Sequence, residues 1–528
     1  MPSRETAPAG RSARFLPAAA AAIVILAVFL RWLHLGRASF FYDELYNVWS
    51  SKLSLTGMLS EQLAGDHPPL YFLVARGWYA FGTSEVWARS LSATAGLLAV
   101  LFIFLAAREL FSRRAAFWTA AFAAASPLLI WYSRASTYYS FMIALATLSL
   151  WLLIRASKKG GWINWTAYTL AVAALLFTYF FGASLIAAGW LVYLFIGSRD
   201  RRRLIEWLTS QAALIAITGI SYIVSKSAQA EPHRLHLLGR SDILHLAYDL
   251  TVVPFVLLLG AVDSGINYSG IEGLPKVHAV LFLAAAAIVL IAYFSLGWFR
   301  QLIRDRRMAA AAAFLVILVI GPLILQLING GSLSGRFIVW AAPALLLILG
   351  AVIAAAPSRT GIVLGTLLLV ALASTSMWEI YHTTSGDADW RSLIGIINQE
   401  RAGGDRIIGI PLNNSTIAAD YYLTQPMPIT GGVPSIDKDA IYFPPAGQPW
   451  GGYKSGFFVG SGPVPPLSGP ALEQQLQTEF AGASRLWVIE QTGLVKPGVQ
   501  QALAHGWVEE NHWDFGAMQL GLYVPLPE

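Results

Sequence analysis

Two adjacent acids near the start of the chain are the first residues whose types and setting suggest chemistry. Asp43 and Glu44 lie within the aromatic segment FFYDELYNVW at residues 40–49. A carboxylate in such a segment can take a proton from an attacking hydroxyl group, which is the work of a general base. The structural alternative is that Asp43 caps a helix that starts at Glu44. The pair is the best candidate in the sequence for an active site.

A second polar cluster follows in GDHPPLYF at residues 65–72. Two consecutive prolines predict a helix that begins there, because proline is tolerated in a first helical turn. His67 precedes this helix and Tyr71 lies in its first turn. A histidine here could position a substrate, bind a metal or share a proton, whereas its plainer role is a hydrogen bond or cap. No HExxH motif accompanies it, so the sequence gives no pattern for a metal site.

Two arginines complete the set of candidate residues. Arg134 lies with Tyr138 and Tyr139 in WYSRASTYYSF, and Arg336 lies in GGSLSGRFIVWAAP. An arginine near a helix end can simply extend its side chain to the membrane interface. Its guanidinium is also a fixed fork of donors that suits phosphate oxygens. We expect these residues to contact a lipid-linked phosphate, which would also stabilise the charge of a leaving group.

The composition predicts the kind of scaffold that positions these residues. Of 528 residues, 56% are hydrophobic and 12% are charged, and the mean hydropathy is +0.56, values typical of membrane proteins. The net charge is +6, but the basic residues cluster in short loops between apolar runs, which indicates orientation in a membrane and no nucleic-acid partner. The chain has no cysteine, which excludes disulfides and thiolate chemistry.

Apolar runs of membrane length fill the first 379 residues. A helix needs about 20 apolar residues to cross the hydrocarbon core. We predict eleven spans, near residues 15–34, 85–107, 115–132, 138–155, 162–180, 182–197, 205–225, 277–298, 309–328, 337–355 and 361–379. Basic residues follow every even-numbered span and also precede the first. The positive-inside rule then predicts a cytoplasmic N-terminus and an external C-terminus.

The predicted external segments are a first loop, a middle loop and a tail. The first loop, 35–84, has amphipathic stretches at 45–55 and 68–82 that suit the membrane interface. The loop 226–276 holds a short apolar run at 252–260 that suits an interfacial or re-entrant segment. Residues 1–379 would thus form a transmembrane domain and 380–528 a small soluble α/β domain.

Local patterns predict the elements of the tail. WRSLIGIINQERAGG is typical of a helix ended by glycine, RIIGIP of a strand and STIAADYYL of a helix. ALEQQLQTEF, RLWVIEQ and VQQALAHG then predict a helix, a strand and a helix. The stretch 431–468 is rich in glycine, proline and aromatics, and we interpret it as a long ordered loop, with a flexible linker as the alternative.

The order of these motifs resembles a known family. An Asp-Glu pair after the first span, HPPLY, a YSR turn and a late Arg-Phe are similar to the polyprenyl-phosphate-sugar-dependent GT-C glycosyltransferases. The nearest group is the bacterial branch related to protein O-mannosyltransferases and to aminoarabinose transferases of lipid A. DADWRSLIGIINQE also resembles the start of the periplasmic domain in many bacterial members.

The resemblance implies a fold, a reaction and a role for each candidate residue. A sugar would move from a polyprenyl phosphate to a hydroxyl group of a lipid, polysaccharide or protein acceptor, with inversion, on the periplasmic face of a bacterial inner membrane. Asp43 would be the base or acceptor-orienting carboxylate and Glu44 its support. Arg134 and Arg336 would contact the donor phosphate, and His67 occupies a position where some relatives have a lysine. The resemblance names no certain cofactor and leaves a divalent metal ion open.

One position departs from the family pattern. Many relatives carry Glu-Ala-Arg in the turn where this chain has Ala135-Ser136-Thr137, so a second arginine is missing there. The contacts of that turn with donor or acceptor therefore do not follow from the family.

Other functions compete with glycosyl transfer. A transporter or flippase of lipid-linked sugars would carry ionisable residues or broken helices near the bilayer midplane, often in two related halves. The spans here have few charges at their centres, and the polar residues gather at one face, which favours interfacial catalysis. A ligase-like polymerase would have its dominant external loop between late spans. An inactive scaffold stays open, because fold resemblance does not establish activity.

Overall fold

The computed structural model describes residues 9–64, 67–198, 200–228, 304–328, 338–382, 389–410, 412–431, 433–434, 441–442, 469–492 and 502–526. The chain divides into two compact units. The helical unit comprises Met1–Leu35, Arg89–Ser227 and Glu231–His382. The mixed unit comprises Gly36–Ala88, Ala228–Ala230 and Thr383–Glu528.

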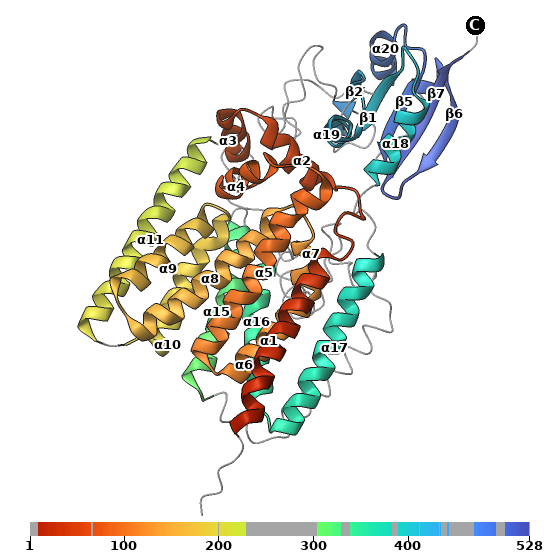
Figure 1. The fold of residues 1–528 in the computed structure, drawn as a ribbon. Coiled ribbons are helices and arrows are strands. Elements are labelled where there is room, and N and C mark those ends of the chain that lie inside the picture. Colours follow the sequence, from red (N-terminus) through yellow and green to blue (C-terminus); the bar gives the residue numbers. More distant parts are fainter. Residues whose placement is uncertain are drawn as a thin grey trace, which may run out of the picture. The chain divides into compact units, whose positions relative to one another are not determined.

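The helical unit is a bundle of long apolar helices (Figure 1). Its helices are α1 (Ala9–Trp32), α5 (Glu85–Leu110, which starts in the mixed unit), α6 (Arg113–Ala125), α7 (Pro127–Ser133), α8 (Tyr138–Lys159), α9 (Trp162–Leu176), η1 (Phe180–Ala183), α10 (Ser184–Ile196), α11 (Arg201–Ala228), α15 (Arg306–Ile328), η4 (Val339–Ala341), α16 (Ala342–Ala355) and α17 (Ser358–His382). Ten of the eleven predicted runs overlap these helices, and 277–298 lies outside the described residues. The mostly helical fold that the composition predicts is confirmed.

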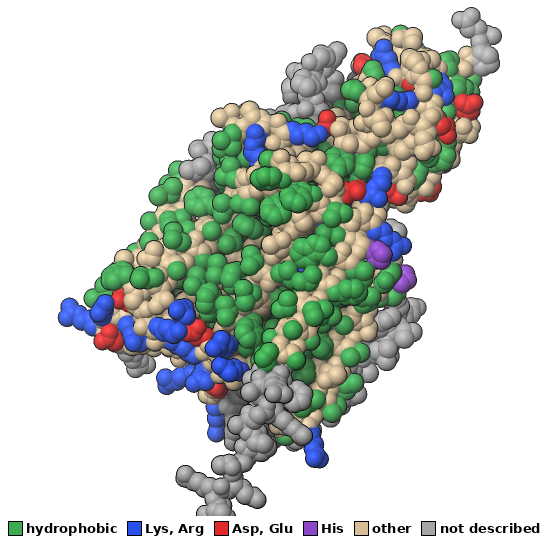
Figure 2. All heavy atoms as spheres, in the orientation of Figure 1, with side chains coloured by type: hydrophobic (Ala, Val, Ile, Leu, Met, Phe, Trp, Pro, Cys, Tyr) green, Lys and Arg blue, Asp and Glu red, His purple; other side chains and the backbone are tan. Residues whose placement is uncertain are grey.

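Several of these helices have the length and composition of membrane spans. Within the described ranges, α5, α8, α11 up to Ile223 and α17 each qualify alone, and α6 with α7 makes a fifth if the pair is one broken span. Apolar side chains cover much of the face of the helical unit that Figure 2 shows, as expected of helices that face lipid. The number of eleven spans stays a prediction.

The third predicted span is a single run in the sequence, but the structure breaks it into α6 and α7, which meet at 57°. Pro127 opens α7 and has no N–H, so the carbonyl of Ala123 loses its helical partner. Arg31 on α1, which is fully buried, donates to the carbonyls of Ala123 (3.2 Å) and Ala124 (3.1 Å). Ser376 on α17 donates to the carbonyl of Ala125, the last residue of α6, at 2.8 Å. Side chains from α1 and α17 thus provide hydrogen-bond donors for the backbone carbonyls at the end of α6.

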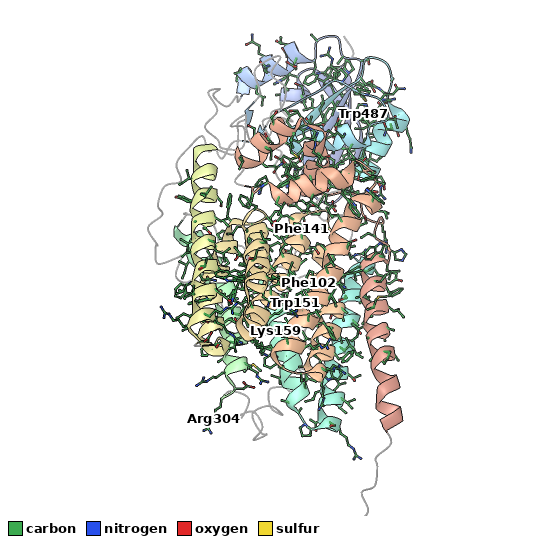
Figure 3. All side chains as sticks on the ribbon, turned by 60° about the vertical axis from the view of Figure 1, so that its left-hand side comes forward. Phe102, Phe141, Trp151, Lys159, Arg304 and Trp487 are labelled. Atoms are coloured by element: carbon green, nitrogen blue, oxygen red, sulfur yellow. The ribbon has the colours of Figure 1, made fainter. Side chains whose placement is uncertain are left out.

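Lysine and arginine side chains gather at one end of the helical unit (Figure 2). Figure 3 places Lys159 and Arg304 toward this end and Phe141, at the start of α8, toward the other. Arg203 at the start of α11 donates to the carbonyl of Lys158 at 3.0 Å, which joins two of the basic loops. The basic loops therefore share an end, as their alternation along the chain predicts. The side of the membrane that this end faces stays a prediction.

The tail forms a five-stranded sheet in the order β2-β1-β5-β7-β6 (Figure 1). β2, β1 and β5 are parallel, and β7 and β6 are antiparallel to their neighbours. Leu472 and Leu476 of helix α20, with Phe480 directly after it, form a core with the strands β1 and β5. The tail elements are α18 (Trp390–Glu400), β1 (Arg406–Ile410), α19 (Leu412–Tyr422), β2 (Ile429–Gly431), β3 (Val433–Pro434), β4 (Ile441–Tyr442), α20 (Gly469–Glu479), β5 (Leu486–Gln491), β6 (Trp507–Asp514) and β7 (Met518–Pro525).

The local predictions for the tail are confirmed for three helices and two strands, with two corrections. Helix α18 ends with Arg401 as its C-cap, ahead of the glycines that were expected to end it. The last predicted helix, VQQALAHG, lies partly outside the described residues, and the pattern did not predict β6 and β7. Most of 431–468, like the loop 226–276 from residue 229, is also outside the described residues.

A buried ion pair joins the starts of two inner strands of this sheet, β1 and β5. Asp405 accepts two hydrogen bonds from Arg485, at 2.7 and 3.0 Å, and one each from the Trp487 indole and the Ala402 N–H, both at 2.9 Å. Burial alone would raise the pKa of the Asp405 carboxyl, but these hydrogen bonds together bring it below its usual value. The carboxylate therefore stabilises the fold at neutral pH.

We predict that Asp405→Asn destabilises β1 and β5 by about 3 kcal/mol, because one partner of a buried pair is lost. Hydrogen exchange of the full chain should show β5 amides losing about 100-fold in protection. In the wild type, the stabilisation should be complete above the unfolded pKa, about 3.9, and be lost as the pH falls through the lower folded pKa. The exposed Asp514→Asn is the control, and equal protection in both variants would contradict the prediction.

Candidate active site

The two predicted acids have different surroundings in helix α2 (Tyr42–Lys52). The helix begins at Tyr42 with Phe41 as its N-cap, so Asp43 lies in the first turn and the alternative in which Asp43 caps a helix starting at Glu44 is wrong. Glu44 is fully buried, and its Oε2 accepts from the N–H of Phe41 at 3.3 Å, which closes the helix start. The Asp43 side chain is exposed. The Glu44 carboxylate thus binds the backbone at the start of α2, whereas the Asp43 side chain is exposed to solvent.

Helices α3 (Leu55–Ala64) and α4 (Leu70–Tyr79) hold α2 in place. The hydroxyl of Tyr46 on α2 donates to Glu61 Oε1 on α3 at 3.0 Å. Arg76 on α4 donates to the carbonyls of Ser51 (2.7 Å) and Leu53 at the end of α2. The first-loop stretches predicted as helices are α2 and α4, whereas α3 was not predicted.

His67 and Tyr71 belong to this group of helices. The prolines after His67 precede α4, as predicted. The imidazole of His67 is half-buried, 5.9 Å from the ring of Phe72, and its backbone N–H donates to the carbonyl of Gln62 at 2.8 Å. The Tyr71 side chain is fully buried. The structure thus places His67 near the surface, whereas Tyr71 lies on the buried side of α4. The contacts of both residues with a substrate stay predictions.

Residues of the tail contact the segment that leads into α2. Tyr422 on α19 accepts from the N–H of Phe40 at 2.9 Å and donates to Glu85 Oε1 at 2.6 Å. Arg391 on α18 forms an ion pair with the same Glu85 carboxylate. Burial and the bond to Glu85 raise the pKa of Tyr422, and the same carboxylate raises the pKa of Arg391. No local pattern predicts these contacts, because they join residues more than 300 positions apart.

In the helical unit, Arg134 lies at the C-terminal end of α1. Its Nη1 donates to the carbonyl of Leu33 at 2.5 Å and its Nη2 to that of His34 at 3.2 Å. Leu33 and His34 directly follow the last residue of α1, and Nη1 also donates to the carbonyl of Arg31 in the last turn at 3.4 Å. The end of a helix leaves its last carbonyls without an intrahelical partner, and a cation there also suits the helix dipole. The guanidinium of Arg134 therefore caps α1, a role that the sequence did not predict.

A second guanidinium lies beside Arg134. Arg89 on α5 is buried and donates to the carbonyl of Leu35 at 3.0 Å. Burial, with a smaller contribution from repulsion by Arg89, lowers the pKa of Arg134 to about 10. The Arg134 guanidinium therefore stays protonated at neutral pH. Two close cations at one helix end are better stabilised when an anion is bound, which makes this end of the helical unit a candidate phosphate site.

Tyr138 and Tyr139 open α8 next to this turn. Their ring centroids are 4.3 Å apart, Tyr139 lies 4.7 Å from Tyr132, and Tyr138 lies 6.1 Å from Tyr179. Tyr139 is buried and Tyr138 is half-buried. The rings form an aromatic wall close to Arg134 in sequence. Arg336 lies outside the described residues.

Arg31 is a buried cation that the sequence reasoning missed. It lies in the first predicted span and is fully buried, with donors on the carbonyls freed by the α6–α7 break. A charge inside an apolar run is the signal that could have found it.

The comparisons with known proteins concern both sequence and fold. The family model described as dolichyl-phosphate-mannose-protein mannosyltransferase matches residues 66–224. None of the curated proteins matches the sequence. ArnT from Cupriavidus metallidurans in the apo state superposes with a TM-score of 0.58 at 13% identity, over 97% of this chain and 98% of that one. These relatives are GT-C glycosyltransferases. This chain has the GT-C fold.

Two further solved structures share the GT-C fold. ArnT bound to undecaprenyl phosphate gives a TM-score of 0.56 at 14% identity and 98% coverage of both chains. The oligosaccharyltransferase of Archaeoglobus fulgidus in complex with Zn and sulfate gives 0.50 at 11% identity, over 96% of this chain and 73% of that one. The family-model match includes His67, Tyr71 and Arg134, whereas Asp43 lies before it.

The described residues do not supply a metal centre. Across those ranges, no group of three or more His, Asp or Glu side chains could hold a metal ion. The divalent metal that the sequence left open therefore has no such group of ligands in this part of the chain.

Proposed function

We propose that the protein is a membrane glycosyltransferase that moves a sugar from a polyprenyl phosphate to a hydroxyl acceptor, with inversion, on the periplasmic face of a bacterial inner membrane. The observation that carries the proposal is the exposed carboxylate of Asp43 beside a neighbour, Glu44, that is already used by its helix. The family-model match and the GT-C fold support the donor class.

In the proposed reaction, Asp43 accepts the proton of the acceptor hydroxyl as its oxygen attacks the anomeric carbon. A C–O bond to the acceptor forms, and the bond between the anomeric carbon and the phosphate oxygen breaks. The lipid phosphate leaves with the electron pair of that bond. Attack from the face opposite the leaving group inverts the anomeric centre. Glu44 supports the reaction by holding the first turn of α2, which carries Asp43.

The phosphate would be held by Arg134 with Arg89, which already repel one another at the end of α1. The phosphate gains negative charge as its bond to the sugar breaks, so it offsets that repulsion more in the transition state than in the bound donor. This stronger interaction in the transition state lowers the activation barrier for sugar transfer. Arg336 remains a further proposed contact, and Tyr138 and Tyr139 would line the donor's path. The proposal covers a lipid, a polysaccharide or a protein as the molecule that carries the acceptor hydroxyl.

Transport of a lipid-linked sugar is the second candidate function. It is favoured by one observation, the broken pair α6–α7 with the buried charge of Arg31 beside it. Broken helices and intramembrane charges are features of transporters. Here, however, the carbonyls freed by the break are already bound by Arg31 and Ser376, so the break has a structural explanation.

Thermal unfolding in detergent tests the donor class. Undecaprenyl phosphate should raise the unfolding temperature, because a ligand that binds only the folded state stabilises it by about 2.7 kcal/mol at 100 times its Kd. Undecaprenol, which has the same chain without the phosphate, should raise it less. Equal shifts for the two lipids would contradict a phosphate site.

A further inference from the structure

We infer that helices α18 and α19 of the tail hold the segment 36–40 that leads into α2, which makes Tyr422 a positioning residue for Asp43. The inference rests on the proposed function, because it assigns the tail a part in the same transfer. All the contacts lie within the mixed unit.

The hydroxyl group of Tyr422 is the centre of this contact. It accepts from the N–H of Phe40 at 2.9 Å and donates to Glu85 Oε1 at 2.6 Å, so one oxygen links the backbone before α2 to the first residue of α5. Phe40 is three positions before Asp43, and its buried ring lies 5.1 Å from the ring of Tyr421. Removing the hydroxyl would break both links and leave the aromatic packing in place.

Arg391 holds the same segment from α18. Its guanidinium pairs with Glu85 and donates to the carbonyls of Gly36 (3.1 Å), Ala38 (3.2 Å) and Arg37 (3.3 Å). Three consecutive backbone carbonyls thus bind one side chain. A planar fork of five donors allows this, whereas a lysine could not reproduce it.

Hydrogen bonds within the tail join the helices that carry Arg391 and Tyr422. Asn398 on α18 donates to the carbonyl of Tyr422 at 2.9 Å, and its own Oδ1 accepts from Thr424 at 3.0 Å. These hydrogen bonds join α18 to the C-terminal end of α19. A catalytic carboxylate gains from such support, because a misplacement of about 1 Å can cost about 100-fold in rate.

A nearby ion pair supplies a matched control. Lys52 on α2 and Asp420 on α19 pair at 2.7 Å, and their side chains are 48% and 49% exposed. Exposed pairs contribute only about 0–1 kcal/mol. Asp420→Asn therefore removes a contact between α19 and α2 but keeps the hydrogen bond from the N–H of Phe40 to Tyr422.

The kinetic test compares Tyr422→Phe with Asp420→Asn in full-length protein reconstituted with donor and acceptor. We expect Tyr422→Phe to lower kcat about 10- to 100-fold and to leave the KM for donor unchanged, because the chemistry is misaligned while binding is kept. Asp420→Asn should match the wild type. A wild-type kcat in Tyr422→Phe, or an equal loss in both variants, would overturn the inference.

A distance measurement separates this inference from the proposed function. The chain has no cysteine, so spin labels at Leu55→Cys and Gln425→Cys, both at exposed positions, are unique. We expect a narrow distance distribution in the wild type and a broad one in Tyr422→Phe. An unchanged narrow distribution would overturn the hold by Tyr422. If the wild type transfers no sugar, the proposed function fails, and the label distances still decide whether the tail holds the segment.

Discussion

Replacing Asp43 with asparagine should lower kcat for sugar transfer by about 10²- to 10⁴-fold, the usual contribution of a general base. Asparagine has nearly the same shape but cannot take up the acceptor's proton. Because the Asp43 side chain is exposed, the variant should fold and insert as the wild type does. Initial rates with purified protein in liposomes, together with unfolding temperatures, measure both expectations.

The neighbouring acid provides the control for this experiment. In Glu44→Gln, the amide oxygen can still accept from the N–H of Phe41, so most activity should remain. Glu44→Ala removes the cap and should destabilise α2 by about 0.5–2 kcal/mol. Wild-type transfer by Asp43→Asn, or an equal loss in Glu44→Gln, would contradict the assignment of Asp43 as the base.

Arg134→Ala should raise the KM for donor about 10- to 100-fold, because hydrogen bonds to a charged group contribute about 1.5–3 kcal/mol. The structure adds a second effect, since the same side chain caps α1 through the carbonyls of Leu33 and His34. The unfolding temperature without donor should therefore also fall. Donor titrations and thermal unfolding of the same preparation separate the two effects.

A distant arginine is the control for charge. Arg155 lies at the basic end of the helical unit, where its Nε donates to Asn164 Oδ1 at 3.2 Å. Arg155→Ala removes one positive charge and should leave the KM for donor unchanged. If Arg134→Ala only lowers the unfolding temperature and keeps the donor KM, Arg134 is a helix cap and its proposed phosphate contact is wrong.

The helices of the helical unit were predictable because they lie in long apolar runs, and such a run is recognised within a single segment of the sequence. The break at Pro127 was not predicted, because the run around it is apolar throughout and only its partners Arg31 and Ser376 reveal how it is tolerated. Strand β6 was missed for a related reason. WVEENHWD is mostly exposed and lacks the alternation of apolar residues that predicts strands.

The candidate site was predictable only where its signal is local. Asp43, Glu44 and Arg134 stand out as charges at the ends of apolar runs. The division of labour between the acids was not predictable, because it depends on the helix starting at Tyr42. Tyr422 and Arg391 were also missed, since their partners lie 337 to 382 positions away for Tyr422 and similarly far for Arg391. No pattern within one segment carries that information.

Release of free lipid phosphate from the donor measures the proposed sugar transfer most directly. Purified protein in liposomes would receive a panel of undecaprenyl- and decaprenyl-phosphate sugars with lipid, glycan and peptide hydroxyl acceptors. The proposal predicts that at least one donor yields free polyprenyl phosphate and a glycosylated acceptor of inverted configuration, and that Asp43→Asn yields neither. Movement of intact donor across the bilayer with no cleavage of the sugar–phosphate bond would contradict it and indicate a transporter.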